Sequence, residues 1–113
     1  MGNVKNMAKN EMLVPYNSHR IMCVKVGKVK RESLYEMTRK YWKASLQRAS
    51  GATHVLAIID GIVEAVYLPK SWEMTEEMRI MFEGVEDIDS DYIGKCVDAF
   101  YGKSQNPVKY INM

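Results

Sequence analysis

Basic side chains interleaved with aromatic rings, between Lys25 and Arg48, are the part of the sequence best suited to binding a ligand. Eight of these 24 positions are Lys or Arg, and only Glu32 and Glu36 oppose them. Cations neutralise phosphate groups and release their counterions, while a flat ring stacks on an unpaired base. The segment therefore predicts a nucleic-acid surface, and a solvated helix face over core aromatics is the alternative. The rings belong to Tyr35, Tyr41 and Trp42.

A polar turn near the C-terminus is the second candidate. It lies between Gly102 and Pro107 and offers donors and acceptors at one spot, which suits a base edge or a phosphate. Turns of this composition are also common as plain connections. The polar run consists of Lys103, Ser104, Gln105 and Asn106.

Two other functions stay open. A small hydrolase or nuclease-like enzyme would use Glu64 and Lys95, with both side chains pointing at each other in one deep cavity. A protein–protein adaptor would instead expose Met74, Met78 and Met81 as one apolar patch. A single carboxylate without a partner argues weakly for acid–base chemistry. The sequence therefore favours a binding protein without catalysis of its own.

The usual motifs of nucleotide, metal and nucleophile chemistry do not occur, since there is no GxGxxG, Walker loop, GxSxG or HExxH. Two histidines are too few for a zinc site, and His54 reads as a half-buried structural residue or a general base. Cys23 and Cys96 fall in apolar stretches typical of inert thiols. The acidic residues between positions 73 and 91 lack EF-hand spacing and predict solvated loops. We expect no metal, no cofactor and no catalytic residue.

Length and composition predict one soluble domain. The chain has 113 residues, of which 47% are hydrophobic and 27% charged, with a net charge of +2. That charge excludes a strongly polybasic protein but leaves room for a basic patch. Residues 1–18 read as a flexible arm and residues 19–113 as the domain. Without a signal peptide or an apolar run of membrane-spanning length, we expect a cytoplasmic protein and no membrane partner. The oligomeric state stays open.

The pattern of elements predicts an α+β fold of order β-α-β-β-β-α-β. Ser33 and Glu36 form a capping box, so a helix is expected over residues 34–46 with Arg39, Lys40 and Lys43 on its exposed face. A second helix is expected over residues 91–101, capped by Ser90. Such an order favours a small, mixed, mostly antiparallel pseudo-barrel over a doubly wound sheet.

The strands are expected to be short. Asp60-Gly61 between β-branched runs predicts a type I′ hairpin, with Pro69 ending its second strand. A further strand over residues 79–83 is expected to stop at Gly84. The expected strands span residues 20–26, 55–59, 62–67, 79–83 and 108–112.

Several segments resemble a family of small, mostly uncharacterised bacterial and phage proteins. The resemblance covers about residues 20–112 and is most specific in the Gly102-Lys103-Ser104-Gln105-Asn106-Pro107 segment with the strand after it. It implies no particular activity. It is also carried by Leu34-Tyr35-Glu36, Thr38-Arg39, Trp42-Lys43, Gly61-Ile62-Val63, Val66-Tyr67, Trp72, Phe82, Gly84, Tyr92, Gly94-Lys95 and Tyr110-Ile111-Asn112.

More distantly, the strand order resembles PUA-like domains, including the ASCH and EVE groups. That resemblance implies binding of RNA, or of modified or unpaired DNA bases, in a cleft between the barrel and its first helix. It implies Trp72 as a stacking ring and Arg39 and Lys43 as phosphate or base contacts. Fold-level likeness is a limited warrant for function. The expected nucleic-acid-binding residues are Arg39, Trp42, Lys43, Arg48, Trp72, Lys103, Ser104, Gln105 and Asn106.

Overall fold

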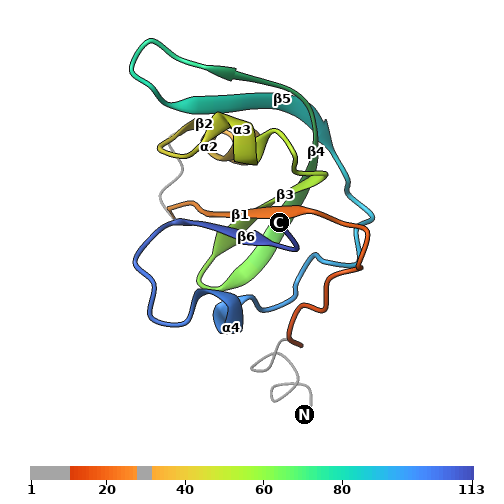
Figure 1. The fold of residues 1–113 in the computed structure, drawn as a ribbon. Helices are drawn as coiled ribbons and strands as arrows, with labels where there is room; N and C mark the ends of the chain where they lie inside the picture. The colour runs from red at the N-terminus through yellow and green to blue at the C-terminus, as the bar shows by residue number, and fades with distance from the viewer. Residues whose placement is uncertain (1–10, 28–31) are drawn as a thin grey trace.

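The computed structural model describes residues 11–27 and 32–113 and forms a single six-stranded sheet with short helices (Figure 1). In chain order the elements are β1 (Ile21–Lys25), α2 (Leu34–Arg39), β2 (Lys40–Trp42), α3 (Leu46–Ala49), β3 (His54–Ile59), β4 (Ile62–Met74), β5 (Ile80–Glu86), α4 (Asp98–Tyr101) and β6 (Val108–Ile111). Within the described residues, no helix is long and apolar enough to cross a membrane.

The strands lie in the order β2-β5-β4-β3-β1-β6 and curl into a half-barrel (Figure 1). β1 pairs in parallel with β3, and the other pairings between named strands are antiparallel. The expected small, mixed, mostly antiparallel α+β sheet is therefore confirmed. Because β1 and β3 run in parallel, the chain between them must cross over the sheet. The segment that crosses carries α2, β2 and α3.

Both faces of the sheet centre are buried, which explains the continuous apolar runs in β1 and β3. Alternate residues of each strand enter opposite hydrophobic clusters. Cys23 packs with Leu56 on the face that carries α4, while Met22 packs with Val55 on the face that carries α2 and α3. Cys23 is fully buried, and burial raises the pKa of its thiol to about 12, as expected for an inert residue.

The hairpin between β3 and β4 turns at Asp60-Gly61, as the sequence predicts. Asp60 has φ 54° and Gly61 has φ 79°, so both turn residues adopt the positive φ that a type I′ turn requires. The Asp98 carboxylate lies against Gly61, where a side chain would collide with it. The hairpin prediction is therefore confirmed, and α4 begins beside its turn.

The second strand does not end at Pro69, and Gly84 does not stop β5. β4 continues to Met74 and β5 to Glu86, which lengthens this edge of the sheet, where β2 pairs with β5 (Figure 1). The pairing register of β4 with β5 shifts between Pro69 and Ser71, which accommodates a proline that has no N–H to donate to the neighbouring strand. Gly84 is needed for close approach, because a Cβ there would lie 2.9 Å from Pro69 Cα. Pro and Gly thus mark an irregularity inside the strands instead of their ends.

Both expected helices are shorter than predicted. The helix expected over residues 34–46 ends at Arg39, and a second short helix, α3, begins after Ser45. The helix expected over residues 91–101 forms only as α4. The first half of the expected helix forms backbone hydrogen bonds with Val63 of β4 instead: Lys95 O accepts from Val63 N, and Gly94 N donates to Val63 O. Tertiary hydrogen bonds therefore replace the helical ones there.

Part of the expected N-terminal arm is packed against the domain. Residues 1–10 lie outside the described residues, but Leu13 is buried in the core. Leu13 N donates to Cys96 O, and Cys96 N donates to Glu11 O. Tyr16 N donates to the hydroxyl of Tyr92 at 3.0 Å. Residues 11–18 therefore belong to the fold.

Candidate functional site

The candidate site is built around Tyr41 and Trp42, which together line two hollows of the surface. One hollow has a volume of about 340 Å³ and contains carboxylates; we call it the mixed hollow. The other has a volume of about 590 Å³ and contains cations; we call it the basic groove. We call Tyr41 and Trp42 the aromatic ridge because they are common to both linings.

The ridge exists because the first helix ends early. Ser33 caps α2, its hydroxyl accepting from Glu36 N at 3.2 Å, as the capping box predicts. After Arg39 the chain becomes extended at Lys40 and joins the sheet edge, where Lys40 pairs with Met81 and Trp42 with Ile80. The register shifts between these pairs, and the residue in between, Tyr41, takes the positive φ of 71°.

Tyr41 combines a strained backbone with an exposed ring. A positive φ is unfavourable for a bulky residue, and its side chain is 56% exposed. The Lys40 ammonium lies 5.2 Å from the centre of the Tyr41 ring. Strain of this kind gathers at binding sites, where the surrounding structure holds it.

Trp42 is held in place by α2. Its indole Nε1 donates to Thr38 O at 2.7 Å. The last carbonyls of a helix have no partner within the helix, so this bond satisfies one of them and fixes the ring. Trp42 is half-buried, packs against the core and still lines both hollows.

The basic groove runs from the ridge to the start of β6. Lys43 and Arg79 are both exposed, and within the described residues neither makes an ion pair or side-chain hydrogen bond. The groove contains no carboxylate, so it is a cationic surface next to two aromatic rings. Its lining consists of Tyr41, Trp42, Lys43, Arg79, Asn106, Pro107 and Val108.

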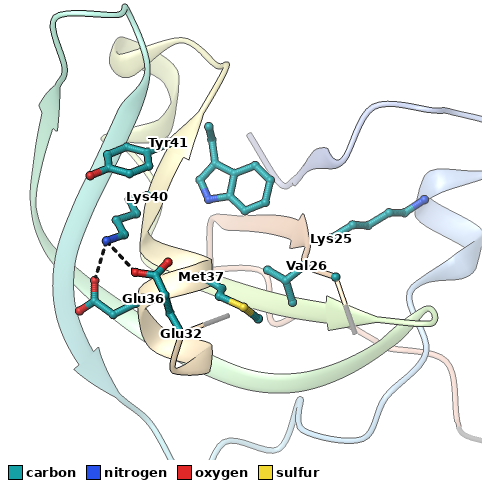
Figure 2. Close-up of a pocket in the computed structure, with 9 residues that line it drawn as sticks. Lys25, Val26, Glu32, Glu36, Met37, Lys40 and Tyr41 are labelled. Carbon is teal, nitrogen blue, oxygen red and sulfur yellow. Dashed lines mark ion pairs between the residues drawn. The ribbon is translucent and has the colours of Figure 1, made fainter. Parts of the chain in front are cut away.

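The mixed hollow shares Tyr41 and Trp42 with the groove, and Figure 2 shows the side chains that line it. Lys40 Nζ is 3.1 Å from Glu32 Oε2 and 3.2 Å from Glu36 Oε1. The hydrogen bond from Lys40 lowers the pKa of Glu36, and the bond to Glu32 raises the pKa of Lys40, so both groups stay charged at neutral pH. Val26 and Met37 supply apolar surface.

Lys25 lines the mixed hollow but directs its charge elsewhere. Its side chain extends away from the Lys40 ion pairs in Figure 2, and its Nζ lies 4.2 Å from the centre of the Tyr101 ring. The charged groups facing one another in the hollow are therefore two carboxylates and one ammonium. The mixed hollow therefore contains side chains of both charges, whereas the charged residues that line the groove in the described part of the chain are both cations.

Arg39 is not on an exposed face, contrary to the sequence prediction. It is 9% exposed, and its Nε donates to Phe82 O at 2.8 Å. Its Nη1 pairs with Glu36 Oε1 at 3.1 Å and its Nη2 with Glu83 Oε2 at 3.6 Å. The early end of α2 turns Arg39 toward β5, so it fastens the helix to the sheet and is not free to contact a phosphate.

Trp72 and Arg48 are also engaged within the fold. Trp72 lies on β4 with its ring centre 5.1 Å from that of Phe82, and it lines neither hollow. The Arg48 guanidinium lies 4.2 Å from the centre of the Tyr110 ring. Of the expected residues, Trp42, Lys43 and Asn106 are the three that the structure brings together.

The polar turn borders the groove through its last residues. Asn106 Oδ1 accepts from Val108 N at 3.0 Å and Ser104 Oγ accepts from Asn106 N at 3.2 Å. The turn is therefore shaped by its own side chains, and Asn106 faces the groove. Lys103 and Gln105 are exposed and Ser104 half-buried, and none of the three lines the groove.

Glu64 and Lys95, the residues of the enzyme alternative, do not gather in either hollow. Lys95 Nζ bonds Glu11 Oε1 at 2.6 Å, while Glu64 is exposed on β4, and neither Glu64 nor Lys95 lines either hollow. Of the adaptor residues, Met74 is 39% and Met78 68% exposed, while Met81 is half-buried.

A second polar cluster joins the N-terminal segment to β3. The rings of His19 and His54 stack with centres 4.0 Å apart, and His19 Nδ1 lies 2.7 Å from the Tyr92 hydroxyl. Burial, with a smaller effect of His19, lowers the pKa of His54, although Asp87 opposes the shift. His54 is half-buried, and its structural role stays a prediction. Among the described residues, no three His, Cys, Asp or Glu side chains are grouped to hold a metal.

Two residues of the site are absent from the expected set of binding residues. Tyr41 was named among the rings of the basic segment but was placed within a helix, and Arg79 was placed in a strand. Ser45 was the missed signal, since a serine N-cap before Leu46 marks a second helix start and hence a break after Arg39. Lys28, Lys30 and Arg31, which contribute to the basic segment, lie outside the described residues.

Comparisons with protein-family models, with curated proteins and with solved structures found no match. The resemblances described for the sequence therefore stay predictions, and the site rests on its own geometry.

Proposed function

We propose that the protein binds an unpaired segment of RNA or DNA along the basic groove, without catalysis of its own. The observation that carries the proposal is the pairing of Lys43 and Arg79, both free of ion pairs among the described residues, with the rings of Tyr41 and Trp42. Cations along a backbone path and rings beside it are what a single strand requires. Asn106 adds an amide at the groove wall for a base edge or a phosphate.

A PUA-like reading of the half-barrel is part of this proposal. In that reading the ligand lies between the barrel and its first helix, and the aromatic ridge follows α2 directly. We also propose the cytoplasm as its compartment, since nucleic acid is present there and both cysteines are free thiols.

The test measures binding of a fluorescent single strand of about 12 nucleotides, as DNA and as RNA, by fluorescence anisotropy. Affinity should fall steeply as salt rises from about 50 mM to about 200 mM. Lys43→Glu and Arg79→Glu should each weaken binding at least tenfold and lower the slope of log affinity against log salt by about 0.7.

The matched control is Arg20→Glu. Arg20 is exposed at the start of β1, next to Ile21, which pairs with Ile111, whereas the groove reaches Val108 at the other end of β6. The control therefore changes net charge equally but leaves the groove intact, and its affinity should stay within about twofold of the unaltered protein. Equal losses in all three variants, or no binding by the unaltered protein, would overturn the proposal.

A further inference from the structure

The strand β6 lies at an edge of the sheet and has β1 as its single neighbour in the described part of the chain (Figure 1). Lys25 N donates to Pro107 O at 2.9 Å, so these two residues form a hydrogen-bonded pair of the antiparallel ladder. Such pairs alternate along a ladder with pairs whose main-chain groups point away from each other. The alternation therefore directs the N–H and C=O groups of Val108 and Tyr110 outward, away from β1.

Part of this outward series of main-chain groups is left without a partner. Asn106 Oδ1 accepts from Val108 N at 3.0 Å, which agrees with the outward direction and satisfies the first group. Among residues 11–27 and 32–113, Val108 O, Tyr110 N and Tyr110 O form no hydrogen bond. An acceptor, a donor and a second acceptor therefore follow one another along the free edge, which is the template that an added strand requires.

Two cations flank the free edge, one on each face of the sheet. Val108 and Tyr110 lie on the face that carries α2 and α3, where the Arg48 guanidinium is 4.2 Å from the centre of the Tyr110 ring. Lys109 alternates with these two residues and so belongs to the opposite face. Within the described residues neither cation pairs with a carboxylate, and Arg48 is exposed while Lys109 is half-buried. A strand added here therefore meets a positive charge on each of its faces.

We propose that the β6 edge binds an extended peptide with acidic residues, which pairs with Tyr110 as an additional strand of the sheet. Adjacent residues of a strand point to opposite faces, so two neighbouring carboxylates of the peptide reach Arg48 and Lys109 together. Main-chain pairing supplies the affinity, and the two ion pairs select for acidic sequences. The edge adjoins the basic groove at Val108, but its main-chain groups play no part in the proposed binding of nucleic acid, so the inference does not depend on that function.

The same observations disfavour two other occupants of the edge. A second copy of this chain, pairing through its own β6, would bring another Arg48 and another Lys109 to the edge, and like charges repel across a strand pair. A nucleic acid would meet the cations but has no repeating series of N–H and C=O groups to match the edge. An acidic peptide satisfies the charges and the main-chain groups together.

The test measures binding of a fluorescein-labelled peptide of about eight residues, with two neighbouring glutamates at its centre, by fluorescence anisotropy. Replacing both glutamates with glutamine should weaken binding about tenfold. Methylating the two central amide nitrogens should also weaken it about tenfold, because a strand pairs through alternate residues and one of these N–H groups faces Tyr110 in either register. The same two methyl groups at the end of the peptide should change the affinity by less than about twofold.

Variants of the protein test the two cations. Arg48→Glu and Lys109→Glu should each weaken binding of the diglutamate peptide about tenfold. Lys70→Glu is the matched control, since Lys70 is exposed on β4, which is separated from β6 by β3 and β1. It changes the net charge equally and should keep the affinity within about twofold. Thermal unfolding checks that the variants are folded, and Arg48→Gln and Lys109→Gln, with a smaller loss in the same direction, replace any charge reversal that unfolds the protein.

Several results would overturn the proposal. Binding that survives methylation of the central amides would show attraction by charge alone, without strand pairing. No binding at protein concentrations up to about 1 mM would show that the cations only protect the edge from pairing. A dimer of the unaltered protein in sedimentation velocity, with no peptide bound, would identify a second copy as the occupant. Oligonucleotide binding that falls in both Arg48→Glu and Lys109→Glu, again without peptide binding, would assign the edge to the nucleic acid.

Discussion

The indole N–H of Trp42 donates to the carbonyl oxygen of Thr38 at 2.7 Å. This bond spans the last turn of α2, and Thr38 is fully buried, with its own hydroxyl donating to Leu34 O at 2.7 Å. The ring is therefore oriented before any ligand arrives. A fixed ring loses little conformational entropy on binding, which favours affinity.

Trp42 and Trp72 are the two tryptophans of the chain, so their fluorescence can be assigned by substitution. In the Trp72→Phe variant, the remaining Trp42 emission should be quenched when a single-stranded oligonucleotide binds, because a base lies against the ring. In the Trp42→Phe variant, the Trp72 emission should change little, since Trp72 packs on Phe82 and lines neither hollow. Quenching of Trp72 alone would contradict this assignment.

Arg39 should matter for stability. Arg39→Met removes the donor to Phe82 O and leaves Glu36 and Glu83 without their guanidinium partner. We expect the free energy of unfolding in urea to fall by about 2 to 4 kcal/mol. Lys43→Met, at an exposed position, should change it by less than about 0.5 kcal/mol. A similar small change for both variants would show that the buried guanidinium is dispensable.

His54 predicts a dependence of stability on pH. Its pKa is lowered in the folded protein, chiefly by burial and also by His19, from the ordinary value of 6.5. The unfolded chain therefore takes up a proton at a higher pH than the folded chain. This contribution to stability is complete above pH 6.5 and is lost as the pH falls below it.

Urea unfolding at several pH values between about 8 and about 5 measures this dependence. The His54→Gln variant should show a flatter profile in the same range, because it has no such group to protonate. Hydrogen bonds from Lys95 and Lys40 lower the pKa values of Glu11 and Glu36, respectively, from 4.5. These two carboxylates therefore change the stability only at pH values below this range. An equally steep profile in the His54→Gln variant would show that another group causes the pH dependence of stability.

Gly84 should be intolerant of substitution. An added Cβ would collide with the Leu68 carbonyl and lie 2.9 Å from Pro69 Cα, so Gly84→Ala must displace backbone in β4 or β5. We expect a loss of about 1 to 3 kcal/mol of unfolding free energy. Gly27→Ala is the control, since no atom of the described residues lies within 4 Å of a Cβ placed there. Equal unfolding free energies for Gly84→Ala and Gly27→Ala would show that β4 and β5 can move apart at Gly84 without a loss of stability.

The sheet was predictable where the local pattern and the tertiary structure agree. The apolar runs of β1 and β3, the Asp60-Gly61 turn and β6 follow directly from the residues. The first helix was predicted too long, because its periodicity continues past Arg39 while the chain joins the sheet edge at Lys40. Local helix propensity cannot predict this pairing, because the pairing depends on β5, a strand much later in the chain.

The site was predictable only in part, because tertiary contacts decide which of its residues come together. Trp42, Lys43 and Asn106 were selected by type, and the fold brings them to one groove. Arg39 was placed on the wrong side because its exposure was inferred from a helix continuing over residues 34–46. Arg79 directly precedes β5, far along the chain from Lys43, and spacing along the chain does not predict that both line one groove.

Parallel pairing of β1 with β3 requires a crossover segment, and the whole aromatic ridge lies on that segment, in the edge strand β2. This connection is one contiguous stretch of sequence between Lys25, the last residue of β1, and His54, the first residue of β3. Replacing that segment in a designed chimera would exchange the ring pair together with Glu32, Glu36 and Lys40, while Lys25, Arg79 and Asn106 would stay with the rest of the chain.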